Sequence, residues 1–408
     1  MQEGMKNRLR KTWMLIAVTA PLFTLAQSAN QQITGQDDKR NPITVAVPFV
    51  SFAPDSRGSA MGDAGVASSP DVYSSYWNSA KLAFVENDLG LSFSYSPWLG
   101  KIVNDMSLNY LTFYKKIDRL QTFGASFRYF DLGEIQLTDS DGFPLGIENP
   151  QELAVDATYS RKLTENMSVG VTTRFIWSNI AGNISGAPDA KAATSVAVDI
   201  GYYYHKDIIF SGTDSEIAFG ANLSNFGQKV NYSNESNEDF IPTNLKLGAS
   251  FKTNIDPYNS ITLLIDANKL LVPTPPIYEL DEDNNRILDP ATGKFKIVDG
   301  GGKDPDRTLL SGTFGSFTDA PNGFSEEIQE IMLSVGAEYL YRDAFALRVG
   351  YFTESINKGN RKYFTAGLGF KYQIFGVDFS YLVPQQKDHP LGDTLRLSFQ
   401  FNMDKTES

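Results

Sequence analysis

From about residue 88 to its end, the chain repeats one pattern: every second side chain is apolar over roughly ten residues, and a polar interruption follows. The clearest example is segment 395–401, where Leu and Phe alternate with Arg, Ser and Gln. A period of two predicts β-strands with one apolar and one polar face. The chain is therefore expected to fold as strands that each need an apolar environment on one face only.

We count fourteen such segments between residues 88 and 402. Single-chain barrels of bacterial outer membranes have an even number of antiparallel strands, so this count favours a closed barrel. In the second segment we expect Met106, Leu108 and Tyr110 to face lipid. The opposite faces carry charges that must point into the lumen, because a lipid-facing Arg or Lys at mid-membrane costs about 2–4 kcal/mol. These charged positions are Arg128, Asp156, Arg174, Asp199, Lys246, Asp266, Glu338, Arg348, Asp378 and Arg396.

The connections between segments support the same fold. Long loops alternate with short turns, as expected for an even barrel whose N- and C-termini both lie in the periplasm. The longest loop covers residues 269–329 and is expected to be extracellular. A soluble sandwich or propeller would also contain alternating strands, but it would not account for this loop parity or for aromatic residues near the strand ends.

The first 26 residues read as a secretory signal peptide, with a basic start, an apolar middle and a small-residue cleavage site before Gln27. The chain has no Cys, which argues against disulfides, thiolate metal sites and a lipidated cysteine. After residue 26, no apolar run reaches the roughly 18–20 residues that a spanning helix needs, so a closed barrel is the expected way into a membrane. The net charge of −12 disfavours nucleic acid as a partner.

The lumen of a barrel of this size must be plugged or conduct, because about eight strands already enclose a volume that side chains can fill. We assign residues 27–87 to an N-terminal extension and lumen plug, 88–402 to the barrel and 403–408 to a C-terminal tail. The stretch 53–67 is rich in Gly, Ala and Ser, which allow close packing against a wall. The predicted plug residues are Asp55, Arg57, Gly58, Met61, Gly62, Asp63, Gly65, Trp77 and Asn78, of which Asp55, Arg57, Asp63 and Asn78 can pair with lumen charges.

Residues for catalysis or metal binding are scarce. The two histidines, His205 and His389, are expected at solvated strand or loop edges, so a Ser-His-acid hydrolase has little to draw on. The acidic run 281–285 resembles a calcium loop, but Arg286 stands where the turn Gly is required and Thr292 where the bidentate Glu is required. We therefore predict no enzymatic activity, no catalytic residue, no cofactor and no metal site.

The loop 269–329 is the exception among short connections, and structureless insertions of this length are usually functional. It begins with a Pro-rich run at 272–278, a stiff and extended type of segment that can present side chains to a partner. Aromatic residues further along are exposed unless something covers them. The predicted partner-binding residues are Pro275, Pro276, Ile277, Tyr278, Phe314, Phe317 and Phe324.

The plug segment resembles the N-terminal hatch of the FadL-like outer-membrane family, and more narrowly that of the PorV family of the type IX secretion system. The likeness lies in the runs DSR at 55–57, MGDAGVA at 61–67 and WNSAKLA at 77–83, and also in strand count and length. Ser79 stands where the family usually has Pro, which puts only the rigidity of that turn in doubt.

This resemblance implies an all-β membrane protein of the cell outer membrane, a 14-stranded antiparallel β-barrel with a hatch in its lumen. The PorV family further implies a function in binding secreted proteins that carry a C-terminal secretion domain. Such cargo would be taken from a large, SprA-like translocon barrel and passed to a sortase-like attachment complex, with outer-membrane lipid around the wall. The alternative is a FadL-like transporter of hydrophobic small molecules, which the charged lumen disfavours.

Overall fold

The computed structural model describes residues 40–404, except for 101, 102, 104, 139, 140, 142, 181–190, 234–237, 284, 386–391 and 393. The expected signal peptide, the cleavage site before Gln27 and His389 lie outside the described residues.

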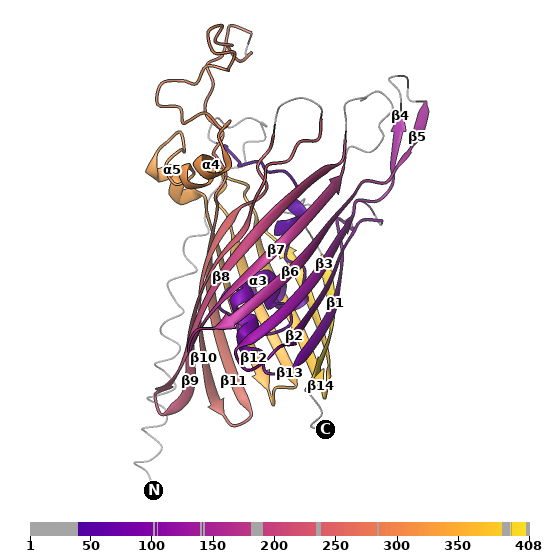
Figure 1. The fold of residues 1–408 in the computed structure, drawn as a ribbon, viewed down its shortest axis with the longest axis vertical. Helices are drawn as coiled ribbons and strands as arrows, with labels where there is room; N and C mark the ends of the chain where they lie inside the picture. Colours follow the sequence, from indigo (N-terminus) through magenta and orange to yellow (C-terminus); the bar gives the residue numbers. More distant parts are fainter. Residues whose placement is uncertain are drawn as a thin grey trace. The chain divides into compact units, whose positions relative to one another are not determined.

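Fourteen antiparallel strands close into a barrel, and each strand pairs with the next barrel strand along the chain (Figure 1). The barrel closes where β1 pairs with β16, with Leu89 opposite Met403 and Tyr95 opposite Leu397. The predicted fold class is therefore confirmed. The barrel strands are β1 (Leu89–Pro97), β2 (Ser107–Lys116), β3 (Gln121–Asp131), β6 (Gln151–Lys162), β7 (Met167–Asn179), β8 (Ala193–Phe210), β9 (Thr213–Gly227), β10 (Asn244–Asp256), β11 (Asn259–Leu270), β12 (Ile331–Tyr341), β13 (Phe345–Thr353), β14 (Lys362–Tyr372), β15 (Phe375–Pro384) and β16 (Leu395–Met403).

Long and short connections lie at different ends of the barrel (Figure 1). We call these the loop end and the turn end. Two further strands, β4 (Ile135–Thr138) and β5 (Pro144–Glu148), pair with each other in the long connection between β3 and β6. Among the helices of the described chain, none combines the length and apolarity needed to span a membrane.

Side chains alternate between the outside of the barrel and its lumen. Phe399 is 45% exposed on the outside, whereas the adjacent Ser398 is fully buried inside. All the charged residues that we expected in the lumen are buried. The two faces of each strand thus have different surroundings, as the period of two predicted.

The prediction was wrong for β2, where Leu108 and Tyr110 are buried in the lumen and Leu111 lies outside. Met106 is also partly buried, against an apolar cluster inside the barrel. Both faces of β2 are apolar, so alternation alone could not distinguish them. The inner face contacts the plug instead of water, and the Tyr110 hydroxyl forms a 3.1 Å hydrogen bond with Ser75 there.

The plug consists of four short helical segments: η1 (Pro48–Ser51), α2 (Ser56–Ala60), α3 (Ser74–Trp77) and η2 (Ser79–Phe84). The α2 helix contacts β13 to β16, whereas η2 contacts β3 and β6 to β8 on the opposite side of the barrel. The plug therefore bridges the lumen between two walls.

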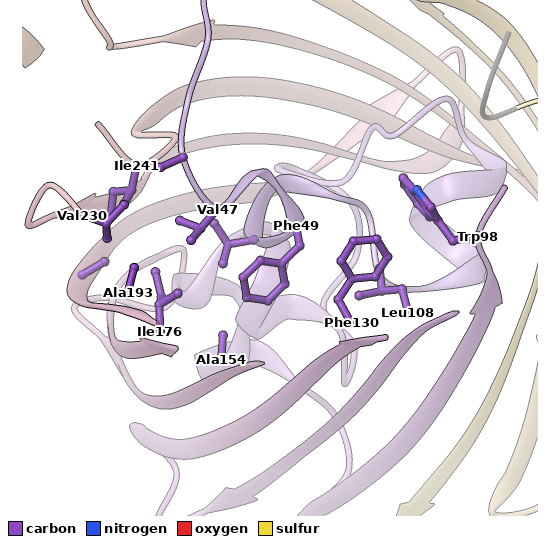
Figure 2. Packing of buried hydrophobic residues seen from close by; sticks show 13 residues of the cluster. Val47, Phe49, Trp98, Leu108, Phe130, Ala154, Ile176, Ala193, Val230 and Ile241 are labelled. Atoms are coloured by element: carbon purple, nitrogen blue, oxygen red, sulfur yellow. The ribbon is translucent and has the colours of Figure 1, made fainter. Parts of the chain in front are cut away.

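An apolar core lies inside the barrel, where η1 meets the wall near the loop end (Figure 2). The Phe49 ring is stacked 6.4 Å from the Phe130 ring of β3. The Phe52 ring lies 4.4 Å from that of Trp98. Apolar packing, as well as paired charge, therefore holds the plug in the lumen.

The longest connection has more structure than we predicted. It contains α4 (Leu309–Gly315) and α5 (Phe324–Gln329), and we call residues 309–330 the platform. Earlier in the same loop, Tyr278 bridges to Ile297 and Leu288 bridges to Phe295. We call this paired segment, residues 277–298, the distal ribbon. The expectation of a structureless insertion was therefore wrong. Helices and paired segments this short produce no periodic pattern of apolar residues long enough to be recognised in the sequence.

Candidate functional site

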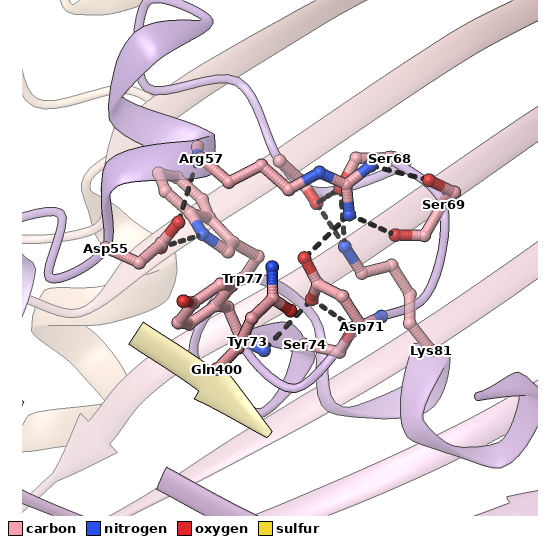
Figure 3. A network of polar contacts seen from close by, with 12 residues as sticks. Asp55, Arg57, Ser68, Ser69, Asp71, Tyr73, Ser74, Trp77, Lys81 and Gln400 are labelled. Carbon is pink, nitrogen blue, oxygen red and sulfur yellow. Dashed lines mark hydrogen bonds and ion pairs between the residues drawn. The ribbon is translucent and has the colours of Figure 1, made fainter. Parts of the chain in front are cut away.

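A buried ionic network ties the plug to the wall. Arg57 Nη1 lies 2.7 Å from Asp71 of the plug, as Figure 3 shows. Arg57 Nη2 lies 3.0 Å from Glu338 of β12. Glu338 also pairs with Arg348 of β13 at 2.6 Å, and Arg348 pairs with Asp378 of β15 at 2.6 Å. Each charge has an opposite partner, which offsets the cost of removing it from water.

Asp55 and Trp77 fasten the helices of the plug to each other (Figure 3). The Trp77 Nε1 donates to one Asp55 oxygen at 2.7 Å, while the Gly58 N–H donates to the other at 2.8 Å and caps α2. A Cβ on Gly58 would lie 2.3 Å from the Trp77 ring. Both hydrogen bonds of the Asp55 carboxylate thus lie within the plug, and within the described residues no ion pair joins it to the lumen charges that we expected as partners.

The turn after α2 lies directly against β13 and β14. The Gly62 N–H donates to Thr365 Oγ1 at 2.9 Å, and a Cβ on Gly62 would lie 2.6 Å from the backbone nitrogen of Tyr351. Gly62 also has a φ of +71°, a conformation that side-chain-bearing residues rarely adopt. The next residue, Asp63, accepts a hydrogen bond from the Tyr363 hydroxyl.

Asp266 of β11 holds the following stretch of the plug. One of its oxygens accepts hydrogen bonds from the N–H groups of Gly65, at 2.7 Å, and Val66, at 2.9 Å. Met61 is buried against Leu264 of the same strand. Alternation predicts that Asp266 faces the lumen, but it does not predict that Asp266 accepts hydrogen bonds from the plug backbone.

Asn78 and Lys81 hold the last part of the plug. The Asn78 amide donates to the Tyr202 carbonyl of β8 at 2.9 Å and to the Val66 carbonyl at 3.1 Å. Lys81 is fully buried and donates to the Gly65 carbonyl at 2.6 Å and to Ser68 Oγ at 2.8 Å. Lys81 is not among the predicted plug residues, although it stands in the run at 77–83 that resembles the hatch.

The platform exposes three of the predicted partner-binding aromatics at the loop end. Phe314 is 66% exposed, Phe317 is 43% exposed and Phe324 is 79% exposed. Leu310 and Ile328 are also exposed on the same two helices. Apolar side chains that stay in water on an ordered element are typical of a surface that another molecule covers.

A buried ionic base holds the platform on the barrel rim. Lys269 of β11 lies 2.9 Å from Glu327 and also pairs with Glu330. Lys358 lies 2.5 Å from Glu326 and 2.9 Å from Glu330. Burial alone would raise the pKa of Glu326, but hydrogen bonds from Lys358, Asn322 and Asn41 together hold that pKa below its usual range.

The Pro-rich residues do not join the aromatic patch. Pro276 is buried and Pro275 is half-buried, while Ile277 is exposed at the start of the distal ribbon. Tyr278 lies under the Arg286 guanidinium, 4.4 Å from its ring centre, and 5.9 Å from the Phe295 ring. The seven predicted partner-binding residues therefore divide between the platform and the ribbon.

A cavity of about 330 Å³ lies between the plug and the wall near the loop end. Its lining combines aromatic and charged side chains, among them Trp77, Phe352, Lys246 and Arg361. The Lys246 Nζ lies 4.9 Å from the Tyr76 ring centre. Within the part of the chain that the structure describes, no group of three or more His, Asp or Glu side chains could hold a metal ion.

Comparison with protein families decides the assignment. The model of the type IX secretion system protein PorV matches residues 35–277, which is more than half of the 408 residues. The chain belongs to the PorV family. As a PorV-family barrel it is an outer-membrane component of type IX secretion. The match covers the plug and Pro275 to Ile277, but not Phe314, Phe317 or Phe324.

Other comparisons give distant likenesses. The PorV-family chain is similar to the toluene transporter TbuX of Ralstonia pickettii, with 12% identity over 86% of this chain and 98% of that one and a TM-score of 0.42. The toluene transporter TodX of Pseudomonas putida has 12% identity over 85% of this chain and 96% of its own, with a TM-score of 0.46. A FadL homologue of Pseudomonas aeruginosa has 9% identity over 89% and 99%, with a TM-score of 0.39. No curated protein matches the sequence.

Proposed function

We propose that this PorV-family barrel binds secreted proteins at its loop end, which faces outward, and carries them from a large translocon barrel to the attachment complex. The cargo would be recognised through its C-terminal secretion domain. The observation that supports this most is the platform, whose exposed aromatics stand on a buried base of charged residues. A rigid, apolar patch can bind a protein without first being ordered.

The plugged lumen supports a binding function more than a conducting one. Charged pairs and backbone hydrogen bonds fix the plug on several sides, so an open path would require many of them to break together. The charged lining of the cavity also suits a hydrophobic ligand poorly. Transport of hydrophobic small molecules is the second candidate function, because the same lining also contains aromatic side chains such as Trp77 and Phe352.

The platform can be tested by replacing Phe314 and Phe324 with serine. Both side chains are mostly exposed, so the barrel should fold normally. If they anchor cargo, the affinity of the purified barrel for an isolated C-terminal secretion domain should fall by about tenfold or more. The measurement is a binding titration in detergent.

The matched control is Ile117→Ser, which removes a similarly exposed apolar side chain at the turn end. Its affinity for the secretion domain should equal that of the wild type. Equal affinity in the Phe314→Ser/Phe324→Ser variant as well would contradict the proposed binding surface.

A further inference from the structure

Residues 41–47, which we call the strap, connect the plug to three separate loops. The Asn41 backbone N–H donates to the Asn357 carbonyl at 2.8 Å, in the connection between β13 and β14. The Asn41 side-chain amide donates to the Pro275 carbonyl at 2.9 Å and to Glu326 of α5 at 3.1 Å. Further along, the Ala46 N–H donates to the Phe240 carbonyl at 2.9 Å, between β9 and β10. All four partners belong to long connections, so the strap lies at the loop end.

The other end of the plug lies near the turn end. The Phe84 ring is 4.5 Å from that of His205, beyond the last residue of β8 that pairs with β7. A few residues later β1 begins at Leu89, opposite Lys115 and Met403. Between Asn41 and Leu89 the chain therefore crosses the lumen once, from the loop end to the turn end. Figure 1 agrees, with the indigo start of the described chain near α4 and α5.

We infer that the chain enters the barrel from outside the membrane through the strap, and that Asn41 is a positioning residue for the partner-binding platform. The entry route follows from the backbone path, together with an outward loop end. We expected the N-terminus of the barrel to lie in the periplasm, whereas this route places the residues near Asn41 on the outer side. The positioning role rests in addition on the proposed function.

The geometry explains why one asparagine can have this role. Its side-chain amide links the Pro275 carbonyl to the carboxylate of Glu326. Its backbone N–H contacts the loop that carries Lys358. Glu326 is itself bonded to Lys358, so the strap completes a ring of contacts around the base of α5. Removing the amide opens this ring on the Asn41 side and leaves α5 held by Lys358 and Lys269, so the helix should open more often.

The entry route can be tested in the full-length protein, because the chain contains no native cysteine. Thr44, Ser325 and Glu165 are exposed, on the strap, the platform and the β6–β7 turn respectively. Each is replaced singly by cysteine, and intact cells are treated with a membrane-impermeant maleimide. We expect Thr44→Cys and Ser325→Cys to be labelled in intact cells, and Glu165→Cys only after the outer membrane is permeabilised.

The outcomes separate the two ideas. If Thr44→Cys behaves like Glu165→Cys while Ser325→Cys is labelled, entry from outside is wrong and the proposed function is unaffected. If Ser325→Cys is protected and Glu165→Cys is labelled, the barrel is inverted, which overturns both the outward platform and the outward strap.

The positioning role is tested with Asn41→Ala and the conservative Asn41→Gln. Loss of two side-chain hydrogen bonds should speed backbone hydrogen exchange of residues 309–330 by about tenfold, with exchange in β12 and β13 unchanged. The affinity of Asn41→Ala for a C-terminal secretion domain should also fall. Asn41→Gln should lie between Asn41→Ala and the wild type in both the exchange rate and the affinity. Unchanged exchange in the platform, or faster exchange with unchanged affinity, would overturn the positioning role.

Discussion

Replacing Gly350 with leucine should convert the closed barrel into a conducting one. A Cβ at Gly350 of β13 would lie 2.0 Å from the Gly62 nitrogen and 2.1 Å from the Met61 carbonyl carbon. These are backbone atoms, and Gly62 already has a φ of +71°, so the plug cannot yield locally. Overpacking typically costs about 1–3 kcal/mol for extra methylenes, and a larger clash with backbone should displace α2 and its turn from the wall.

The measurement is single-channel conductance of the purified variant in a planar bilayer. The wild type should be silent, and Gly350→Leu should show stable openings. Gly100→Leu is the control, because a Cβ there would meet nothing within 4 Å. Should Gly350→Leu fail to fold, Gly350→Ala gives a milder test with the same expected direction. A folded, silent Gly350→Leu barrel would contradict the close seating of the plug against β13.

Replacing Glu338 with alanine should cause the largest loss of stability. Glu338 is the carboxylate between Arg57 of the plug and Arg348 of the wall, and it is almost completely buried. Breaking a buried pair leaves uncompensated charge, which typically costs about 3–5 kcal/mol. Arg57 keeps Asp71 and Arg348 keeps Asp378, so we expect about 3 kcal/mol for this change.

Urea unfolding of the refolded barrel in lipid vesicles measures this loss. Glu338→Gln, which retains hydrogen-bonding oxygen, should lie between alanine and the wild type. Lys294→Ala removes an exposed pair with Asp304 and should leave the free energy of unfolding nearly unchanged. A Glu338→Ala barrel as stable as the Lys294→Ala barrel would show that the network does not anchor the plug.

The barrel was predictable because lipid and lumen impose opposite polarity on alternate residues. That rule fails at β2, where the plug replaces water and both Leu108 and Leu111 meet apolar surroundings. The same rule does not predict the β4–β5 hairpin, which faces neither lipid nor the lumen. The fold could thus be predicted wherever solvent decides a residue's polarity, and not where another part of the chain does.

The candidate site was predictable only in part, for a similar reason. Glycine and other small residues in the run at 53–67 indicate the plug from sequence alone. The partners of those residues could not be predicted, because Arg57 and Glu338 are 281 positions apart. The strap was also missed, since Asn41 has no distinctive neighbours in the sequence and its contacts all lie in remote loops.

The most direct test of the central claim is a pull-down of the tagged, full-length protein from native outer membranes, with bound proteins identified by mass spectrometry. We predict recovery of a very large barrel together with secreted proteins that share a C-terminal domain, and loss of those secreted proteins in the Phe314→Ser/Phe324→Ser variant. Recovery of a lone barrel carrying hydrophobic small molecules would contradict a cargo-binding function and favour transport.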